Sequence, residues 1–330
     1  MISVIIPAYN SEKTIVSTLK ALLKQNYPKK KYEIIVVDDG SADNTVQLAS
    51  KFPVKIIKIK HTGPAYARNI GAKKARGSIV LFTDSDCIPS KNWIKNMVEP
   101  FKDPEIVGVS GTYKTLNKNK LMARFVGYEI EQRHELMKKS KFIDFIGTFS
   151  AGYRRKIFLK FKGFDTRFKT SSGEDPELSY RIAKSGLKMI FQPKAFVYHP
   201  HPENIWKYLK QKYQRAIWRN FMYWEKHREK ILSDSYTHRF LLPQIIISTL
   251  LILIFLAMFL LGYKILFLIP SILISVFIIA LFFNLDIIIF IWKKDRNLAL
   301  LSPIIYFLRN IFVILGIIVG MIKLLSKKID

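Results

Sequence analysis

Three acidic clusters in a fixed order constrain the fold of this chain more than any other feature. They lie at residues 38–41 (Asp-Asp-Gly-Ser), 83–86 (Thr-Asp-Ser-Asp) and 173–175 (Gly-Glu-Asp). Each of the first two directly follows an apolar run of β type, at 33–37 and 78–82. Such carboxylates are expected where strands end and loops begin, which is where open α/β sheets place their ligands. The pattern therefore predicts an α/β fold with an acidic site along one edge of its sheet.

The amino-terminal part alternates strand and helix patterns. Strands are expected at 2–6, 33–37 and 54–59, and a helical apolar spacing at 15–23 lies between the first two. This alternation is typical of a parallel sheet. A dinucleotide-binding oxidoreductase shares it, but that fold would carry a Gly-x-Gly-x-x-Gly loop after its first strand, where this chain has Pro-Ala-Tyr-Asn at 7–10. Hydride transfer is therefore excluded.

Composition allows one soluble α/β domain together with a membrane segment. The chain has 330 residues, of which 49% are hydrophobic, and a mean hydropathy of +0.12. Its formal net charge of +28 comes without a nucleic-acid recognition motif, so we expect no nucleic acid as partner, but anionic lipid headgroups and pyrophosphate. The single cysteine, Cys87, excludes an internal disulfide framework and is expected to be a small buried thiol.

The carboxyl-terminal part, residues 240–330, is expected to be a transmembrane domain. Residues 240–263 carry no charge and can cross a hydrocarbon layer of about 30 Å as a helix. Further spans are expected at 265–285 and 303–322, and Arg309 is expected to extend to the cytosolic headgroups. An odd number of spans leaves the following lysines outside, against the positive-inside tendency, so a re-entrant or interfacial last segment remains an alternative.

The segment 203–239, which precedes these spans, mixes aromatic side chains with lysine and arginine. Such a segment suits an amphipathic helix that lies in the headgroup layer, and an ordinary helix packed on the amino-terminal domain is the alternative. The chain begins directly with a strand pattern, so we expect no cleavable signal peptide. We therefore expect an integral protein of the cell membrane whose soluble domain, residues 1–202, stays in the cytosol.

Several short motifs follow one another between residues 2 and 215. They are Val4-Ile5-Ile6-Pro7-Ala8-Tyr9-Asn10, Asp38-Asp39-Gly40-Ser41, Ala67-Arg68-Asn69-Ile70-Gly71, Asp84-Ser85-Asp86, Gly163-Phe164-Asp165, Gly173-Glu174-Asp175 and Tyr198-His199. Each motif alone is weak, but in this order the chain resembles the family 2 glycosyltransferases of the GT-A fold. The resemblance implies a Rossmann-like, mostly parallel sheet and transfer of a sugar from a nucleotide donor.

The resemblance also implies a nucleotide-sugar site. Its members would be Pro7, Ala8, Tyr9, Asp38, Asp39, Arg68, Asn69, Asp84 and Ser85, with Gln211 and Arg215 approaching the acceptor or the diphosphate. The aspartates would bind base and ribose, and residues 7–9 would frame the base. A solvated turn is the alternative for Asp39, and a helix-cap and surface-pair role is the alternative for Arg68 and Asn69.

The motif at 84–86 is similar to the metal motif of that family. Alternate residues of an extended segment point to opposite faces, so Asp86 can bind the ion while Asp84 meets ribose or a metal-bound water. Mg²⁺ or Mn²⁺ would bridge the diphosphate and neutralise the leaving nucleoside diphosphate. In relatives a histidine at the place of His199 completes the metal shell or touches the diphosphate. Acids at a strand end without a metal, and a structural histidine, are the alternatives.

Asp175, beside Glu174, is the expected catalytic base. In similar enzymes the aspartate of this motif takes the proton from the acceptor hydroxyl. The oxygen then attacks the anomeric carbon from the face opposite the leaving diphosphate, which inverts the configuration in one step. A cap of the following helix is the structural alternative, and a capping carboxylate can also act as a base. Pro176 departs from the commoner residue at its place but fits a first helical turn.

Processive relatives carry Gln-x-x-Arg-Trp, whereas Gln211 and Arg215 are separated by three residues here and no Trp follows. This departure and the short membrane part argue against polymer synthesis. We expect an inverting, metal-dependent hexosyltransferase that moves one sugar from GDP-mannose or a UDP-sugar to a hydroxyl of a lipid-linked glycan. A polyprenyl-phosphate acceptor is the alternative, although a phosphate needs no strong base. A non-catalytic membrane scaffold is a third hypothesis.

Overall fold

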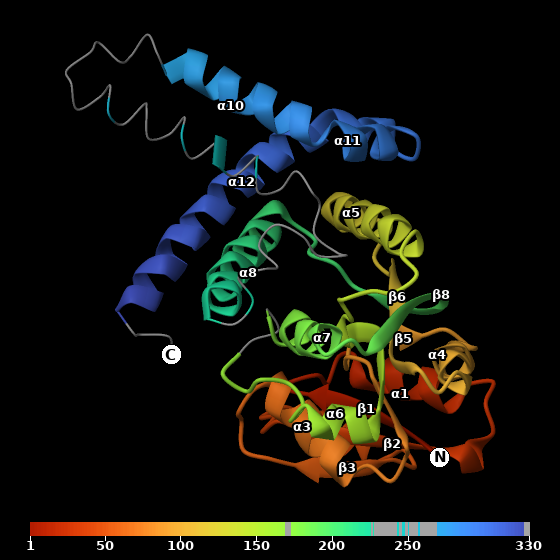
Figure 1. The fold of residues 1–330 in the computed structure, drawn as a ribbon. Coiled ribbons are helices and arrows are strands. Elements are labelled where there is room, and N and C mark those ends of the chain that lie inside the picture. Colours follow the sequence, from red (N-terminus) through yellow and green to blue (C-terminus); the bar gives the residue numbers. More distant parts are fainter. Residues whose placement is uncertain are drawn as a thin grey trace. The chain divides into compact units, whose positions relative to one another are not determined.

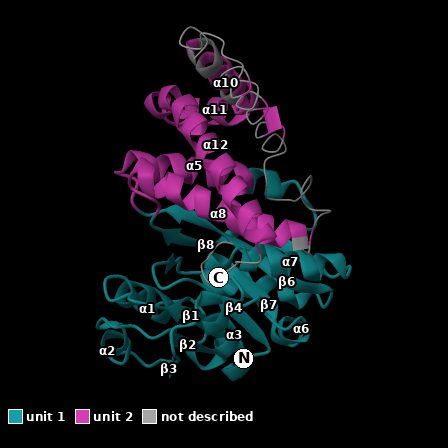
Figure 2. Ribbon diagram, turned by 90° about the vertical axis from the view of Figure 1, so that its left-hand side faces the viewer, with its two compact units in different colours: residues 1–116, 134–200 teal, residues 117–133, 201–330 magenta. Residues whose placement is uncertain are grey.

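The computed structural model describes residues 1–168, 173–225 and 269–326, together with His227, Pro243, Ile246, Ile247, Leu250 and Ala257. The chain divides into two compact units (Figure 2). The first comprises residues 1–116 and 134–200, and the second comprises residues 117–133 and 201–330.

An eight-stranded mixed sheet forms the core of the first unit (Figure 1). Its strands are β1 (Ile2–Ala8), β2 (Tyr32–Asp38), β3 (Lys55–Lys58), β4 (Ile79–Phe82), β5 (Ile88–Pro89), β6 (Ile106–Thr115), β7 (Ala151–Arg154) and β8 (Lys188–His199), in the order β3-β2-β1-β4-β7-β6-β8-β5. Neighbours from β3 to β4 are parallel, β7 is antiparallel to β4 and β6, and β8 is parallel to β6. The predicted α/β fold is confirmed.

Short helices connect and cover these strands. They are α1 (Ile15–Leu23), α2 (Thr45–Ala49), α3 (Pro64–Lys74), α4 (Trp93–Val98), α6 (Arg155–Lys160) and α7 (Glu174–Lys184), with 3₁₀ turns η1 (Lys29–Lys31), η2 (Glu99–Lys102) and η3 (Thr148–Ser150). The predicted helix at 15–23 buries Ile15, Leu19 and Leu22, which stand three or four residues apart, against the sheet core.

Register brings the ends of three parallel strands to one edge of the sheet. Ala8 pairs with Asp38 across β1 and β2, and Ile5 pairs with Phe82 across β1 and β4. The segment after β2 is tied to β1, because the Asp39 amide donates to the Ala8 carbonyl at 2.8 Å. The residues that follow these strands therefore share one edge, as the acidic pattern predicts.

The second unit is helical. It contains the part of α5 (Leu121–Lys138) up to residue 133, together with α8 (Ile205–Glu225), α10 (Ile269–Phe283), α11 (Leu285–Trp292) and α12 (Arg296–Leu325). Two glycines let α12 lie close to α8. A Cβ on Gly316 would stand 2.5 Å from the Tyr213 carbonyl oxygen, and one on Gly320 would stand 2.7 Å from Asn220 Nδ2. Asn220 Nδ2 also donates to the Ile317 carbonyl at 2.7 Å, which fixes the contact.

Within the described part of the chain, α12 is the one helix whose length and apolar composition suffice to cross a membrane. It contains the span predicted at 303–322 but begins earlier, at Arg296, and continues through Pro303. The span predicted at 265–285 overlaps α10, and the one at 240–263 lies almost entirely outside the described residues. In the predicted interfacial segment, α8 exposes Trp206, and the placement of that helix at a membrane surface stays a prediction.

Glu129 of α5 is the centre of a buried ionic cluster in the second unit. Its carboxylate accepts hydrogen bonds from Lys212 Nζ at 3.0 Å and Tyr208 OH at 3.2 Å, and Arg309 Nη1 lies 3.6 Å away. Burial alone would raise the pKa of Glu129, but Lys212, and then Arg133 and Arg309, lower it to about 2. The expectation that Arg309 extends to the headgroups is wrong: its side chain is 8% exposed and faces Glu129.

The cluster predicts a defined pH dependence of stability. Because folding lowers the pKa of Glu129 from 4.5 to about 2, its stabilising contribution is complete above pH 4.5 and is lost as the pH falls through 2. Glu129→Gln removes that titration. The difference in free energy of unfolding between wild type and variant should therefore narrow as the pH falls from 4.5 towards 2, as measured by denaturant unfolding in detergent. A difference that stays constant over this range would contradict the assignment.

Candidate active site

Asp38 and Asp39 lie at the end of β2 and are both buried. Asp38 Oδ1 accepts a hydrogen bond from the Ser41 amide at 3.3 Å. Asp39 accepts from the Thr62 amide through Oδ1 at 2.8 Å and from the Gly63 amide through Oδ2 at 2.9 Å. Two backbone donors thus hold the Asp39 carboxylate, so this residue organises the turn before α3 instead of forming part of a solvated turn.

Next to Asp39, Tyr9 and His61 form a stacked aromatic pair. Their ring centroids are 4.1 Å apart with an interplanar angle of 20°, and Tyr9 is 48% exposed. Asp39 holds the His61 ring, because Nδ1 of His61 lies 3.0 Å from Asp39 Oδ2. Gly40 has a φ of +75°, and a Cβ there would stand 2.9 Å from the His61 amide nitrogen, so the approach requires glycine. An exposed aromatic face at a strand end can stack on a planar base.

Asp84, Asp86, Cys87 and His199 place one potential ligand atom each within 4.8 Å of one another. Asp86 Oδ1 is buried and has no hydrogen-bond partner among the described residues, and His199 Nε2 is 3.7 Å from it. Burial raises the pKa of Asp86; His199 counteracts this rise and Asp84 adds to it. A buried carboxylate oxygen without a donor, beside a second carboxylate and an imidazole, fits a Mg²⁺ or Mn²⁺ ion.

Two neighbours in this loop support its conformation. Cys87 is fully buried, as predicted, and burial raises the pKa of its thiol well above the usual value, so the thiol stays protonated at neutral pH. Ser85 contacts α1 and the segment before it, and its role toward a nucleotide stays a prediction. Its Oγ is 2.8 Å from Ser11 Oγ, and its carbonyl accepts from Thr18 Oγ1 at 2.9 Å. Both contacts tie the loop after β4 to the start and the buried face of α1.

Arg68 of α3 contacts one member of the metal group, Asp84. Its side chain is 2% exposed, and it donates to Asp84 Oδ1 from Nη2 at 2.7 Å and to Glu174 Oε1 from Nη1 at 3.1 Å. The resemblance implies contact with the nucleotide for this residue, and the alternative is a surface pair. Its guanidinium is buried between two carboxylates, so it does not form a surface pair, and its contact with the nucleotide stays a prediction.

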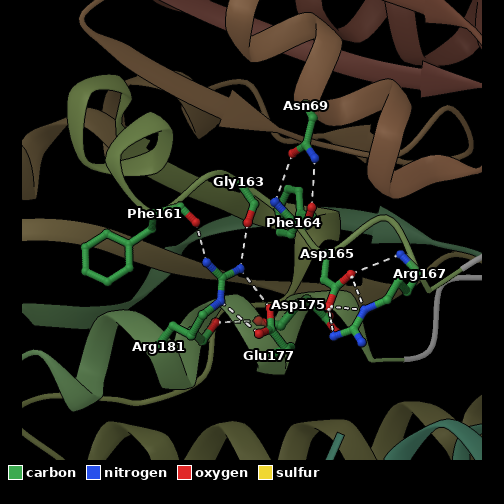
Figure 3. Close-up of polar contacts among 10 residues, drawn as sticks. Asn69, Phe161, Gly163, Phe164, Asp165, Arg167, Asp175, Glu177 and Arg181 are labelled. Atoms are coloured by element: carbon green, nitrogen blue, oxygen red, sulfur yellow. Dashed lines mark hydrogen bonds and ion pairs between the residues drawn. The ribbon is translucent and has the colours of Figure 1, made fainter. Parts of the chain in front are cut away.

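Asn69 holds the turn after α6, as Figure 3 shows. Its Nδ2 donates to the Phe164 carbonyl at 2.8 Å, and its Oδ1 accepts from the Phe164 amide at 2.9 Å. From α7, Arg181 donates to the carbonyls of Phe161 and Gly163 and pairs with Glu177 at 2.8 Å. The turn is therefore fixed to α3 by Asn69 and to α7 by Arg181, and contact of Asn69 with a nucleotide stays a prediction.

Glu174 and Asp175 occupy the first turn of α7. Gly173 is the N-cap residue, so Asp175 lies within the helix and does not cap it. Glu174 is 1% exposed and faces Arg68, whereas Asp175 is partly exposed. Pro176 fits the first turn, where its missing amide hydrogen is not needed. The start of a helix favours a carboxylate, so the partly exposed Asp175 is the better placed of the two to meet an acceptor.

The remaining predicted residues fall into two groups. Pro7 and Ala8 are buried at the end of β1, next to the exposed Tyr9. Gln211 and Arg215 lie on α8 and belong to the second unit. The first unit itself thus contains the aromatic pair, the metal group and the start of α7.

His61 and Ser11 are residues of this site that sequence reasoning missed. His61 follows β3, whose parallel partner β2 ends at the acidic edge, so the rule of strand ends would have placed it there. Ser11 follows β1 by the same rule. No sequence signal predicted that Arg68 pairs with Glu174, because the two are far apart along the chain.

Comparisons with known proteins identify a matching family model and several relatives. Residues 3–161 match the family model of glycosyl transferase family 2. The chain is 32% identical over 222 residues to the probable glycosyltransferase YdaM of Bacillus subtilis, covering 62% of this chain and 52% of YdaM. It thus spans about half the length of that curated relative.

Two further matches extend over nearly the whole chain. The first is the dolichyl N-acetyl-α-D-glucosaminyl phosphate 3-β-D-2,3-diacetamido-2,3-dideoxy-β-D-glucuronosyltransferase of Methanococcus voltae, 25% identical, with 98% of this chain and 97% of that protein covered. The second is the solved structure of the mannosyltransferase PcManGT from Pyrobaculum calidifontis with GDP-Man and Mn²⁺, with a TM-score of 0.59, 19% identity and coverages of 99% and 87%. Residues 3–161 therefore form a glycosyl transferase family 2 domain, and the sheet-containing unit has the GT-A fold.

Proposed function

We propose that this protein transfers one sugar from a nucleotide-sugar, GDP-mannose or a UDP-sugar, to a hydroxyl of a lipid-linked acceptor, with inversion at the anomeric carbon. The observation that carries the proposal is the juxtaposition of the metal group with the start of α7. Arg68 contacts both Asp84 of the metal group and Glu174 of α7, and Glu174 is the neighbour of Asp175. Ligands for a donor and a candidate base are thereby held in one unit.

On the donor side, Tyr9 and His61 offer the aromatic surface for the base. Asp84, Asp86 and His199 would hold a divalent cation, which supplies positive charge for the diphosphate as it leaves. The buried oxygen of Asp86 supports this role, since a cation would provide the partner that the described residues do not. The relative solved with GDP-Man and Mn²⁺ supports the same class of donor and ion.

On the acceptor side, Asp175 takes the proton of the attacking hydroxyl, and Glu174 keeps the first turn of α7 in place through Arg68. The Methanococcus voltae relative, of which 97% is matched, is named for a dolichyl-linked acceptor. The apolar α12 supports attachment to a membrane, where such an acceptor resides. We further propose that the catalytic unit lies on the cytosolic face.

Asp86→Ala should abolish the metal-dependent stabilisation of the protein by its donor while leaving the fold intact. The cation loses a charged ligand, and the fold loses a buried carboxylate oxygen that has no hydrogen bond within the described residues. Thermal shift with a panel of nucleotide-sugars and Mn²⁺ identifies the donor in wild type. A donor at 100 times its Kd stabilises by about 2.7 kcal/mol.

The matched control is Glu105→Ala, which removes an acid that is 65% exposed and pairs with Lys188 on the surface. This control should respond to donor and Mn²⁺ as wild type does. Wild-type donor binding that is unchanged by a chelator would refute metal dependence. Product analysis with a lipid-linked sugar then tests transfer, and donor hydrolysis without transfer to any acceptor would count against the proposed acceptor class.

A further inference from the structure

Arg68 binds two carboxylates that belong to different parts of the site. Nη2 contacts Asp84, which closely follows β4, and Nη1 contacts Glu174, the first residue of α7. The side chains of Arg68 and Glu174 are 2% and 1% exposed, so solvent screens this pair little, whereas Asp84 is 27% exposed. The guanidinium is therefore the shared partner of a carboxylate in the metal group and a carboxylate beside the candidate base.

The two contacts of Arg68 require an arginine at this position. A guanidinium is planar, and its separate N–H groups can engage two carboxylates at once in fixed directions. A lysine ammonium is a compact point charge on a flexible stem and does not reproduce this fork. Arg68 stands at a buried position of α3, and the next residue, Asn69, is fixed to the backbone of Phe164 on both of its polar atoms. The helix that presents the guanidinium is thus anchored.

We propose that Arg68 is a positioning residue that couples occupancy of the metal group to the placement of Asp175. The inference rests on the proposed function. A cation bound by Asp84 weakens the attraction between Asp84 and Arg68. The guanidinium of Arg68 then pairs more strongly with Glu174. That stronger pair holds the first turn of α7, and Asp175 with it. Conversely, without the Glu174 charge Arg68 pairs more strongly with Asp84 and competes with the cation for that carboxylate.

The test is a double-mutant cycle on Mn²⁺ affinity, measured for the full chain in detergent by the electron paramagnetic resonance signal of free Mn²⁺. Glu174→Gln should weaken Mn²⁺ binding, although Glu174 is not a member of the metal group. In the Arg68→Lys background the same change should have an effect smaller by about fivefold or more. Wild-type chain that binds no Mn²⁺ overturns the proposed function and the coupling together. An equal effect of Glu174→Gln in both backgrounds overturns the coupling alone.

Arg181→Lys is the matched control. Arg181 anchors α7 to the carbonyls of Phe161 and Gly163 and contacts Glu177, and it is not a member of the metal group. This variant should leave Mn²⁺ affinity and the effect of Glu174→Gln unchanged. If the effect of Glu174→Gln also shrank in the Arg181→Lys background, Arg68 would have no specific role beyond general stabilisation of α7.

If Arg68→Lys does not fold, amide hydrogen exchange over residues 174–184 gives the answer. Mn²⁺ with GDP or UDP should slow exchange there in wild type and not in Glu174→Gln. Equal slowing in both would overturn the coupling.

Discussion

Asp175→Asn should lower the rate of sugar transfer to a hydroxyl acceptor by roughly 10²-fold or more, with donor affinity retained. The amide has the size of the carboxylate but cannot take the proton of the attacking hydroxyl. Because Asp175 lies inside the first turn of α7 and Gly173 is the N-cap residue, the substitution removes no cap from the helix. The measurement is turnover at saturating donor, together with donor affinity by calorimetry.

Transfer by Asp175→Asn to a hydroxyl acceptor and to a phosphate acceptor shows whether Asp175 acts as a base. A polyprenyl phosphate is already ionised, so transfer to it should fall far less than transfer to a sugar hydroxyl. Asp103→Asn, at an exposed acid outside the site, serves as the control and should keep wild-type turnover. Unchanged hydroxyl transfer in Asp175→Asn would remove this residue from the mechanism, and lost donor binding would make it a donor-site or structural residue.

Glu129→Ala should lower the free energy of unfolding by about 3–5 kcal/mol, since removal of one partner leaves buried cations without compensation. Lys212 is 12% exposed and Arg309 is 8% exposed, so solvent replaces little of the lost interaction. Burial lowers the pKa of Lys212 and Glu129 counteracts this fall, so the positive charge of Lys212 depends on this carboxylate. Denaturant unfolding in detergent at neutral pH measures the loss.

A more exposed ion pair, also made by a glutamate of α5, provides the comparison with the Glu129 cluster. Glu131 pairs with Lys294 at 2.6 Å, but its side chain is 48% exposed. Glu131→Ala should cost only about 0–1 kcal/mol, because water screens and replaces such pairs. Similar losses for the two variants would mean that the cluster around Glu129 is solvated in the folded protein.

Local patterns predicted the sheet and its acidic edge because strands and their ends depend on neighbouring residues. The strands expected at 2–6, 33–37 and 54–59 are β1, β2 and β3 with small shifts at their ends. The acids at 38–39 and 84–86 accordingly lie where those rules place them.

Contacts between distant residues could not be predicted in this way. Arg68 pairs with Glu174 and Asn69 with Phe164, and only the tertiary fold brings these residues together. Glu129 belongs to no motif, and an acid on a long helix is ordinarily solvated. Its pairing with Lys212 and Arg309 depends on how α5, α8 and α12 pack.

The buried thiol at the metal group has a practical consequence for spectroscopy. Cys87 is the only cysteine of the chain, it is fully buried, and its pKa is raised, so reagents that require a thiolate should react with it slowly. A cysteine introduced at an exposed position, such as Lys184 at the end of α7, can therefore be labelled selectively without first removing a native one. The sequence therefore permits distance measurements between a nitroxide on α7 and Mn²⁺ bound at the proposed metal group.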